Sequence, residues 1–233
     1  MKGLFIVIDG TDGSGKGTQT KRLATRLEQE DIPFYVADFP RYGNTSAYFV
    51  EKYLRGEYGQ AHEISAKRAS LFYALDRHDA AAEIQQALDA GKIVISNRYV
   101  SANKGHQAGK IADLEERRQF IDWLNELEYT ILRIPRPDLT ILLHVPADIG
   151  YQLVASKDER GYLDGKKRDI HEADPEHLRN AEQAYLSLPQ IDQGEQWQIL
   201  ECVEQEQLLP IEDIHERLWQ IIQPLIRPAQ PIN

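Results

Sequence analysis

The sequence predicts an α/β fold in which helices cover both faces of a five-stranded parallel sheet. Short apolar runs alternate with longer amphipathic stretches along the whole chain, which is the pattern of βαβ units. Polar and glycine-rich motifs follow the ends of several apolar runs, where ligands bind in such folds. With 233 residues, 42% of them hydrophobic, the chain is long enough to bury a core. We expect one domain over residues 1–226 and a frayed tail at 227–233.

Five apolar runs are short enough to be strands rather than helices. They span residues 4–8, 34–38, 92–96, 139–145 and 197–202. Amphipathic patterns predict helices over 16–30, 45–55, 63–90, 113–127, 147–157, 174–187 and 211–226. Gly91, directly before the third strand, is a candidate C-cap for the preceding helix. Glycines and dense charge between two helical patterns predict a lid-like loop at about 157–172.

Charge and composition exclude several classes of function. The net charge of −10 argues against nonspecific nucleic-acid binding, which needs cations to neutralise phosphates. No apolar run approaches the roughly 18 residues that span a membrane, and the first residues do not match a signal peptide. A single cysteine, Cys202, permits no internal disulfide and fits a reducing compartment. We therefore expect a cytoplasmic protein that binds neither nucleic acid nor membrane.

The stretch "GTDGSGKGTQT", residues 10–20, follows the first apolar run and opens a helical pattern. Gly10, Gly15 and Lys16 meet the G-x-x-x-x-G-K spacing of a phosphate-binding loop, or P-loop. Backbone N–H groups and the helix N-terminus bind phosphates there, and the lysine adds a positive charge. The predicted ATP-binding residues are Asp12, Gly13, Ser14, Gly15, Lys16, Gly17 and Thr18. Gly17 lacks the hydroxyl that usually touches Mg²⁺, so Thr18 is the candidate contact, through water.

Three later segments are candidates for binding the acceptor of the phosphoryl group. They are "DFPRY" (38–42), "SLFYALDR" (70–77) and "SNRYVSANKGHQAGK" (96–110). Two of them begin at the ends of predicted strands. In the segment 70–77, Tyr73 and Arg77 are four residues apart, so they share one helical face and could address one planar base.

These segments together resemble the thymidylate kinase family, which phosphorylates dTMP with ATP and Mg²⁺. The form "GSGKGTQ" is similar to the P-loop of nucleoside monophosphate kinases. The other segments resemble the family patterns F/E-P-R, L-F-x-A-x-R and D-R-Y-x-x-S-x-x-A-Y-Q, in the family's order. The resemblance covers residues 3 to about 226. It implies a three-layer P-loop NTPase fold with a short lid, and a homodimer.

The resemblance also implies roles for individual residues. Arg41 and Arg98 match the arginines that hold the acceptor phosphate, and Tyr73 matches the residue that stacks on thymine. Phe72 is the alternative stacking residue if the register shifts by one. The implied substrate-binding residues are Asp9, Arg41, Tyr42, Phe72, Tyr73, Arg77, Arg98, Asn103, His106 and Gln107. The implied catalytic residues are Lys16, Arg98, Arg168 and Asp9.

Because residue 13 is a glycine, the resemblance also implies a role for the lid in binding the donor phosphates. Some family members carry an arginine at this position, which contacts the donor phosphates. Chains that lack it bring basic residues from the lid, where Arg160, Lys166, Lys167 and Arg168 are candidates. Arg168 is the best placed of them, just before "DIHE".

The chain departs from the family pattern at Asn97, Ala102 and His106. Asn97 replaces the acid of D-R-Y, and His106 replaces a tyrosine beside the sugar, which leaves the choice between deoxyribose and ribose open. We expect Asp9 to be the main acidic anchor for Mg²⁺ and Asn97 to orient a metal-bound water. The alternatives are a kinase for another nucleoside monophosphate or a deoxynucleoside, and a P-loop protein that binds nucleotide without turnover. The donor could be ATP or GTP.

Overall fold

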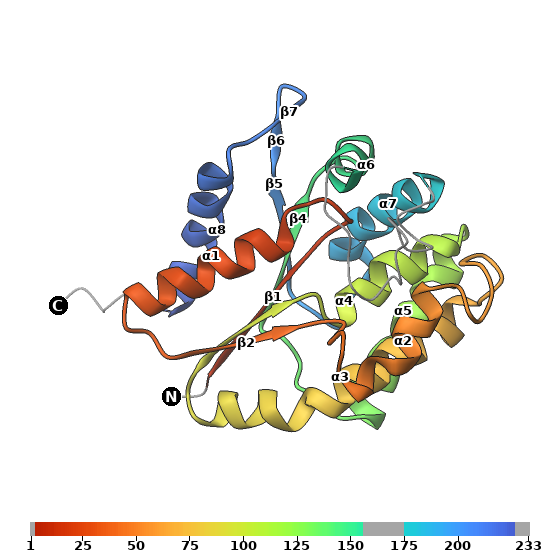
Figure 1. Cartoon of the computed structure of the whole chain (residues 1–233), viewed down its shortest axis with the longest axis horizontal. Coiled ribbons are helices and arrows are strands. Elements are labelled where there is room, and N and C mark those ends of the chain that lie inside the picture. The colour runs from red at the N-terminus through yellow and green to blue at the C-terminus, as the bar shows by residue number, and fades with distance from the viewer. Residues whose placement is uncertain (1–2, 156–174, 227–233) are drawn as a thin grey trace.

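Five parallel strands form the central sheet, as the alternating pattern predicts. The computed structural model describes residues 3–155 and 175–226. The strands are β1 (Leu4–Asp9), β2 (Phe34–Asp38), β3 (Ile93–Asn97), β4 (Leu139–His144) and β5 (Trp197–Glu201). Their order in the sheet is β2-β3-β1-β4-β5, and each pairing is parallel (Figure 1). All five predicted strands are confirmed, with boundaries within one residue.

The helices also follow the predicted segments. They are α1 (Lys16–Gln29), α2 (Tyr48–Leu54), α3 (Ala66–Asp89), α5 (Leu114–Asn125), α6 (Ala147–Ala155), α7 (Pro175–Ile191) and α8 (Ile211–Ile226). The 3₁₀ turn η1 (Thr45–Ala47) precedes α2, and the π-helical segment η4 (Glu126–Ile131) extends α5. Gly91 has a positive φ of 74° after α3. Its N–H and that of Lys92 donate to carbonyls of the last helical turn, so the predicted C-cap is confirmed.

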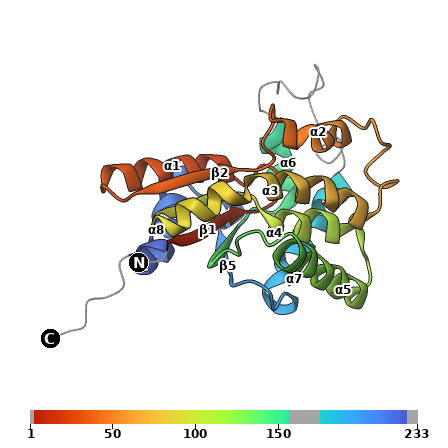
Figure 2. The ribbon, with the colours of Figure 1, turned by 90° about the horizontal axis from the view of Figure 1, so that it is seen from below.

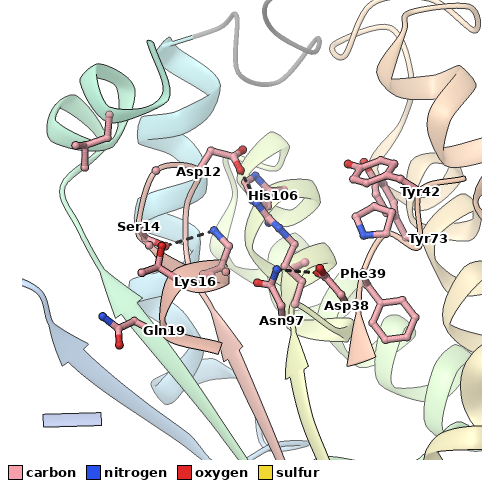
Figure 3. Close-up of a pocket in the computed structure, with 18 of the residues that line it drawn as sticks. Asp12, Ser14, Lys16, Gln19, Asp38, Phe39, Tyr42, Tyr73, Asn97 and His106 are labelled. Carbon is pink, nitrogen blue, oxygen red and sulfur yellow. Dashed lines mark hydrogen bonds and ion pairs between the residues drawn. The ribbon is translucent and has the colours of Figure 1, made fainter. Parts of the chain in front are cut away.

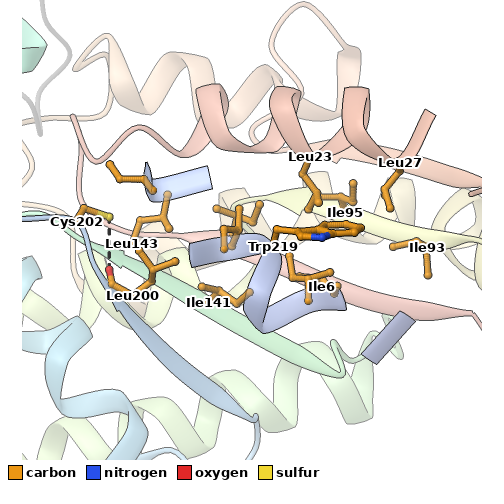
Figure 4. Packing of buried hydrophobic residues seen from close by; sticks show 14 of the residues in the cluster. Ile6, Leu23, Leu27, Ile93, Ile95, Ile141, Leu143, Leu200, Cys202 and Trp219 are labelled. Carbon is orange, nitrogen blue, oxygen red and sulfur yellow. Dashed lines mark hydrogen bonds between the residues drawn. The ribbon is translucent and has the colours of Figure 1, made fainter. Parts of the chain in front are cut away.

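Successive side chains of the strands point to opposite faces of the sheet and form a hydrophobic layer on each face. Ile6 and Ile8 of β1 face α1 and α8, where they pack with Leu23, Leu27 and Trp219 (Figure 4). On the other face of the sheet, Phe5 and Val7 pack against α3. Helix α7 covers the same face beside β4. Figure 1 shows α1 and α8 on one side of the strands and α3 on the other, and Figure 2 shows the same elements from below. The three-layer fold is therefore confirmed.

Two short regions escaped the sequence patterns. Residues 100–110 coil through α4 (Val100–Ala102), the π-helical η2 (Asn103–Gln107) and the 3₁₀ turn η3 (Ala108–Lys110). This region has no regular apolar period, and tertiary contact fixes it instead: a Cβ on Gly105 would lie 2.2 Å from the Tyr185 ring. The hairpin of β6 (Val203–Glu204) and β7 (Gln207–Leu208) is too short to give a pattern.

Candidate active site

A cleft of about 660 Å³ lies at the carboxyl edge of the sheet. The loop after β1, the segment after β2, the end of β3, helix α3 and η2 border it (Figure 3). Every predicted residue of the P-loop, 12–18, lines this cleft. The predicted acceptor residues that line it are Tyr42, Tyr73, Arg77, Arg98, Asn103, His106 and Gln107. The fold thus brings segments from most of the first half of the chain to one place.

The P-loop has the left-handed turns that its glycines permit. Gly13 has φ 87° and Gly15 has φ 83°, both unfavourable for residues with a side chain. A Cβ on Gly13 would also lie 2.3 Å from the carbonyl oxygen of Gly150 at the start of α6, so a side chain does not fit. The Lys16 ammonium donates to the Thr11 carbonyl over 2.7 Å and to Ser14 Oγ over 3.4 Å. The loop therefore holds the cation over its own concave face.

Gly17 and Thr18 lie exposed in the first turn of α1. A Cβ on Gly17 would come no closer than 3.9 Å to the Asn97 side chain, so space does not explain the glycine. Thr18 lines the cleft and carries the hydroxyl of this first turn.

Arg98 stands at the centre of the cleft with a strained backbone. Its φ of 63° lies in the left-handed region that favours glycine. One terminal nitrogen forms an ion pair with Asp12, and the other donates to His106 Nε2 over 2.9 Å. Burial alone would lower the pKa of Arg98, but the charges of Asp12 and Asp9, together with those of nearby tyrosines, raise it. The guanidinium is thus fixed in place and always charged.

His106 is neutral, and its tautomer is fixed. Because arginine can only donate, Nε2 of His106 must accept, which leaves the proton on Nδ1. Burial lowers the pKa of His106 well below its usual value, and the charge of Arg98 lowers it further. The ring also stacks on His177, with centroids 5.7 Å apart.

The other end of the cleft has an aromatic wall. Tyr73 and Phe72 both pack against the aromatic cluster beside α2, where each contacts Tyr53, but only Tyr73 also lines the cleft. Of the two candidate stacking residues, Tyr73 is the one whose ring lies at the cleft (Figure 3).

Polar groups on the floor of this end are almost fully buried. Arg77 is 1% exposed, and its guanidinium binds both carboxylate oxygens of Glu128 over 2.6 Å and the Tyr99 carbonyl over 3.1 Å. Asn103 donates to the Ser70 carbonyl over 3.2 Å. The buried Oε1 atom of Gln107 accepts no hydrogen bond from the described residues. A buried acceptor of this kind costs free energy unless a ligand or a water molecule supplies a donor.

Comparisons with known proteins agree with this geometry. The family model for thymidylate kinase matches residues 8–218. A thymidylate kinase of Clavibacter michiganensis subsp. michiganensis is 31% identical over 191 residues, which cover 81% of this chain and 82% of the relative. One of Mycobacterium tuberculosis is 29% identical over 198 residues, or 84% of this chain and 91% of the relative. The chain belongs to the thymidylate kinase family. The solved structure of the Candida albicans thymidylate kinase shares the fold, with a TM-score of 0.68 at 21% identity over 96% of this chain and 92% of that one.

Membership of this family confirms the resemblance drawn from the motifs and the prediction of an ATP-dependent phosphotransferase. It does not by itself assign the individual residues. The geometry requires corrections at two of them.

Asp9 does not reach the cleft. Its side chain is fully buried, and its carboxylate accepts hydrogen bonds from the Gly10 N–H over 2.7 Å, Tyr185 Oη over 2.9 Å and Ser101 Oγ over 2.5 Å. These three donors take three of the about four acceptor positions of the carboxylate, and Asp9 is not among the residues that line the cleft. The expectation that Asp9 anchors the metal therefore does not fit its buried position, and Asp12 is the acid of this loop that lines the cleft.

Arg41 is turned away from the position predicted for it. Its side chain binds Asp76, Asp79 and Ser46, and it is not among the residues that line the cleft. Two carboxylates of α3 compete with any phosphate for this guanidinium. Arg41 and Arg98 thus have different carboxylate partners in this structure.

The predicted lid and its best cation, Arg168, lie outside the described residues, as do the predicted tail and Arg160, Lys166 and Lys167. Their predicted roles are therefore not tested by the structure.

Sequence reasoning missed two residues of the site. Asp38 is the last residue of β2 and lines the cleft beside Asn97. Glu128 orients Arg77 from η4. Asp38 could have been found, because it ends a strand within the quoted "DFPRY" segment. Glu128 gave no signal, because it lies 51 positions from its partner in an acidic stretch.

Proposed function

We propose that this chain transfers the γ-phosphate of ATP to dTMP, which yields dTDP and ADP. The observation that carries the proposal is one continuous cleft with the P-loop at one end and a buried aromatic and polar wall at the other. In the reaction, a phosphate oxygen of dTMP forms a bond to the γ-phosphorus while the bond between that phosphorus and the β–γ bridging oxygen breaks. Catalysis of this kind depends mainly on positioning and on neutralising charge.

On the donor side, backbone N–H groups of residues 13–18 and the N-terminus of α1 are oriented toward anionic oxygens. Lys16 would leave its loop contacts to bind the phosphates. Leu208, Ile211 and Ile214 line the same cleft beyond Gln19 and give an apolar surface for a purine. This surface is compatible with ATP and with GTP.

The polar groups fit Mg²⁺ only together with nucleotide phosphates. Among the described residues, no group of three or more histidine, cysteine or acidic side chains could hold a metal ion. Mg²⁺ needs only one or two protein carboxylates when phosphates and waters supply the other ligands. Asp12, Thr18 and Asn97 line the cleft and would hold it through water. When bound, the ion neutralises charge on the phosphates.

On the acceptor side, the wall is complementary to thymine. A thymine ring has one N–H donor between two carbonyl acceptors. Gln107 offers the buried acceptor atom, and Arg77 retains two of its five N–H groups after binding Glu128 and Tyr99. Tyr73 offers a ring for stacking. Asn103, Tyr42 and His106 complete the enclosure around the nucleoside.

Arg98 lies between the two ends and is proposed to bind the acceptor phosphate. Its ion pair with Asp12 supports this role, because a guanidinium that binds a carboxylate oxygen can bind a phosphate oxygen in its place. Arg41 would have to leave Asp76 to assist. Arg168 is proposed to neutralise the transferring group from the lid, as inferred from the sequence.

A homodimer is part of the proposal. Tyr48, Phe49, Leu71 and Leu75 of α2 and α3 are each more than 40% exposed, and such apolar surface on helices suits a second copy of the chain. Light scattering at micromolar concentration would test this, and a monomeric mass would contradict it. We also propose that the chain acts in the cytoplasm. No helix in the described ranges could cross a membrane.

The proposed activity can be tested with a coupled assay of ADP release. The assay would compare dTMP with the other ribo- and deoxyribonucleoside monophosphates and with free deoxynucleosides. We expect dTMP to give the highest kcat/KM. A higher value for another acceptor would redirect the substrate assignment, and no ADP release with any acceptor would favour a nucleotide-binding protein without turnover.

A further inference from the structure

Two polar side chains end neighbouring strands at the floor of the cleft. Asp38 closes β2 and Asn97 closes β3, and the two residues are register partners in the parallel pair. Nδ2 of Asn97 donates a hydrogen bond to Oδ1 of Asp38 over 2.8 Å (Figure 3). Both residues line the cleft, so the amide and the carboxylate form one unit facing it.

This pair of side chains explains how the chain can lack the acid of the family's D-R-Y pattern. Asn97 occupies the position where the D-R-Y pattern has an acid. In the structure, a carboxylate is nevertheless present one strand away, held by the amide that replaced the acid. If Asp38 and Asn97 exchanged their side chains, one carboxylate and one amide would still lie at the ends of these two strands.

Asp38 differs from the other two acids near the P-loop. Asp9 is buried beneath three donors, and the charge of Asp12 is paired with Arg98. Asp38 is exposed and lines the cleft, and among the described residues its side chain accepts a hydrogen bond from the uncharged Asn97 amide. Crowding by protein atoms raises its pKa, while the Asn97 hydrogen bond and the charges of Arg98 and Lys16 oppose that shift. Asp38 is thus a carboxylate at the cleft that can bind a cation there.

We propose that Asp38, oriented by Asn97, supplies a second carboxylate beside Asp12, and that it binds the waters of the nucleotide-bound magnesium ion in this chain. The inference rests on the proposed function as a kinase. A carboxylate beside bound phosphates is repelled unless a cation lies between them. Mg²⁺ keeps several waters when phosphates bind it, and these waters donate to nearby carboxylates.

The test uses Mn²⁺ as a probe and compares the parental chain with three variants. These are Asp38→Asn, the double exchange Asp38→Asn with Asn97→Asp, and Asp122→Asn as a control that removes one exposed carboxylate of α5. Electron paramagnetic resonance of free Mn²⁺ gives the affinity of the ion for the enzyme–ADP complex. Thermal unfolding of each variant confirms that the chain is folded.

We expect Asp38→Asn to weaken Mn²⁺ binding by about tenfold, as is typical when an outer-shell partner of a metal is lost. The exchange variant should recover most of the affinity, and Asp122→Asn should match the parental chain. Parental Mn²⁺ affinity in Asp38→Asn would overturn the inference. An exchange variant as weak as Asp38→Asn would overturn it too, because the loss would then follow from altered structure and not from a missing carboxylate.

This readout is separate from the choice of acceptor. It needs only Mn²⁺ and ADP, so a parental chain that fails to phosphorylate dTMP would refute the proposed function and leave the Mn²⁺ comparison interpretable. The Mg²⁺ dependence of ADP release adds a second measure, in which Asp38→Asn should require a higher concentration of the ion.

Discussion

Individual residues show how far sequence patterns assign chemistry. The spacing of Gly10, Gly15 and Lys16 predicts a P-loop, and the structure has its left-handed turns and its inward-facing ammonium. The choice between Asp9 and Asp12 could not be made in this way. Both acids belong to the same short loop, and only the packing of Tyr185 and Ser101 around Asp9 decides which one is covered.

Lys16 should be essential for turnover. Substitution by alanine removes positive charge at the transferring phosphate, where it stabilises the transition state. We expect kcat/KM for the nucleotide substrates to fall at least about a hundredfold, with little change in thermal stability. Steady-state kinetics on Lys16→Ala would check this, and near-parental kcat/KM would contradict the role.

His106 should make stability depend on pH. Its folded-state pKa is lowered, so the unfolded chain binds the proton more readily, and stability falls as the pH drops below the unfolded value of about 6.5. Between pH 7.5 and 5.5 we expect the parental chain to lose about 1 kcal/mol more than His106→Gln, which keeps an acceptor for Arg98 but does not titrate. Urea unfolding at both pH values measures the difference. Equal losses in the two proteins would contradict the buried neutral histidine.

At the scale of elements, the strands and long helices were predictable because their apolar residues repeat with regular periods. The η2 segment was not, although its sequence was recognised as part of the site. Its position depends on a buried ion cluster in which Lys104 binds Asp192 over 2.7 Å and Glu195 over 2.6 Å. Those partners lie 88 and 91 positions along the chain, so no local pattern reveals them.

Loss of the Lys104 charge should destabilise the whole fold. Lys104→Met leaves two buried carboxylates uncompensated, which costs about 3–5 kcal/mol. Lys21→Met, at an exposed position of α1, serves as the matched control and should change stability by less than about 0.5 kcal/mol. Chemical denaturation would compare them. Similar unfolding free energies for both variants would show that the cluster is weaker than its geometry implies.

The whole molecule depends on α8, the last described helix, closing one face of the sheet. Trp219 is 3% exposed and packs with Leu23 and Leu27 of α1, while the Arg26 guanidinium lies 4.3 Å from its ring centre. The amphipathic pattern predicted this helix. That it would pack beside the first helix of the chain depends on the order of the strands, which a sequence pattern does not give.

Trp219→Ala should remove about 3–5 kcal/mol of stability, because a large buried ring is replaced by a cavity. Leu225→Ala on the same helix is the control, since Leu225 is 46% exposed and should change stability by less than about 0.5 kcal/mol. Thermal and urea unfolding of both variants would test the difference. A small effect of Trp219→Ala would mean that α8 contributes little to the core.

The central claim is that the cleft transfers phosphate from ATP to dTMP. The most direct measurement follows the label from [γ-³²P]ATP into product when the parental chain is incubated with dTMP and Mg²⁺, with Lys16→Ala in parallel. The account predicts labelled dTDP from the parental chain and almost none from Lys16→Ala. It would be contradicted if the parental chain left dTMP unlabelled, or if the label appeared only as inorganic phosphate.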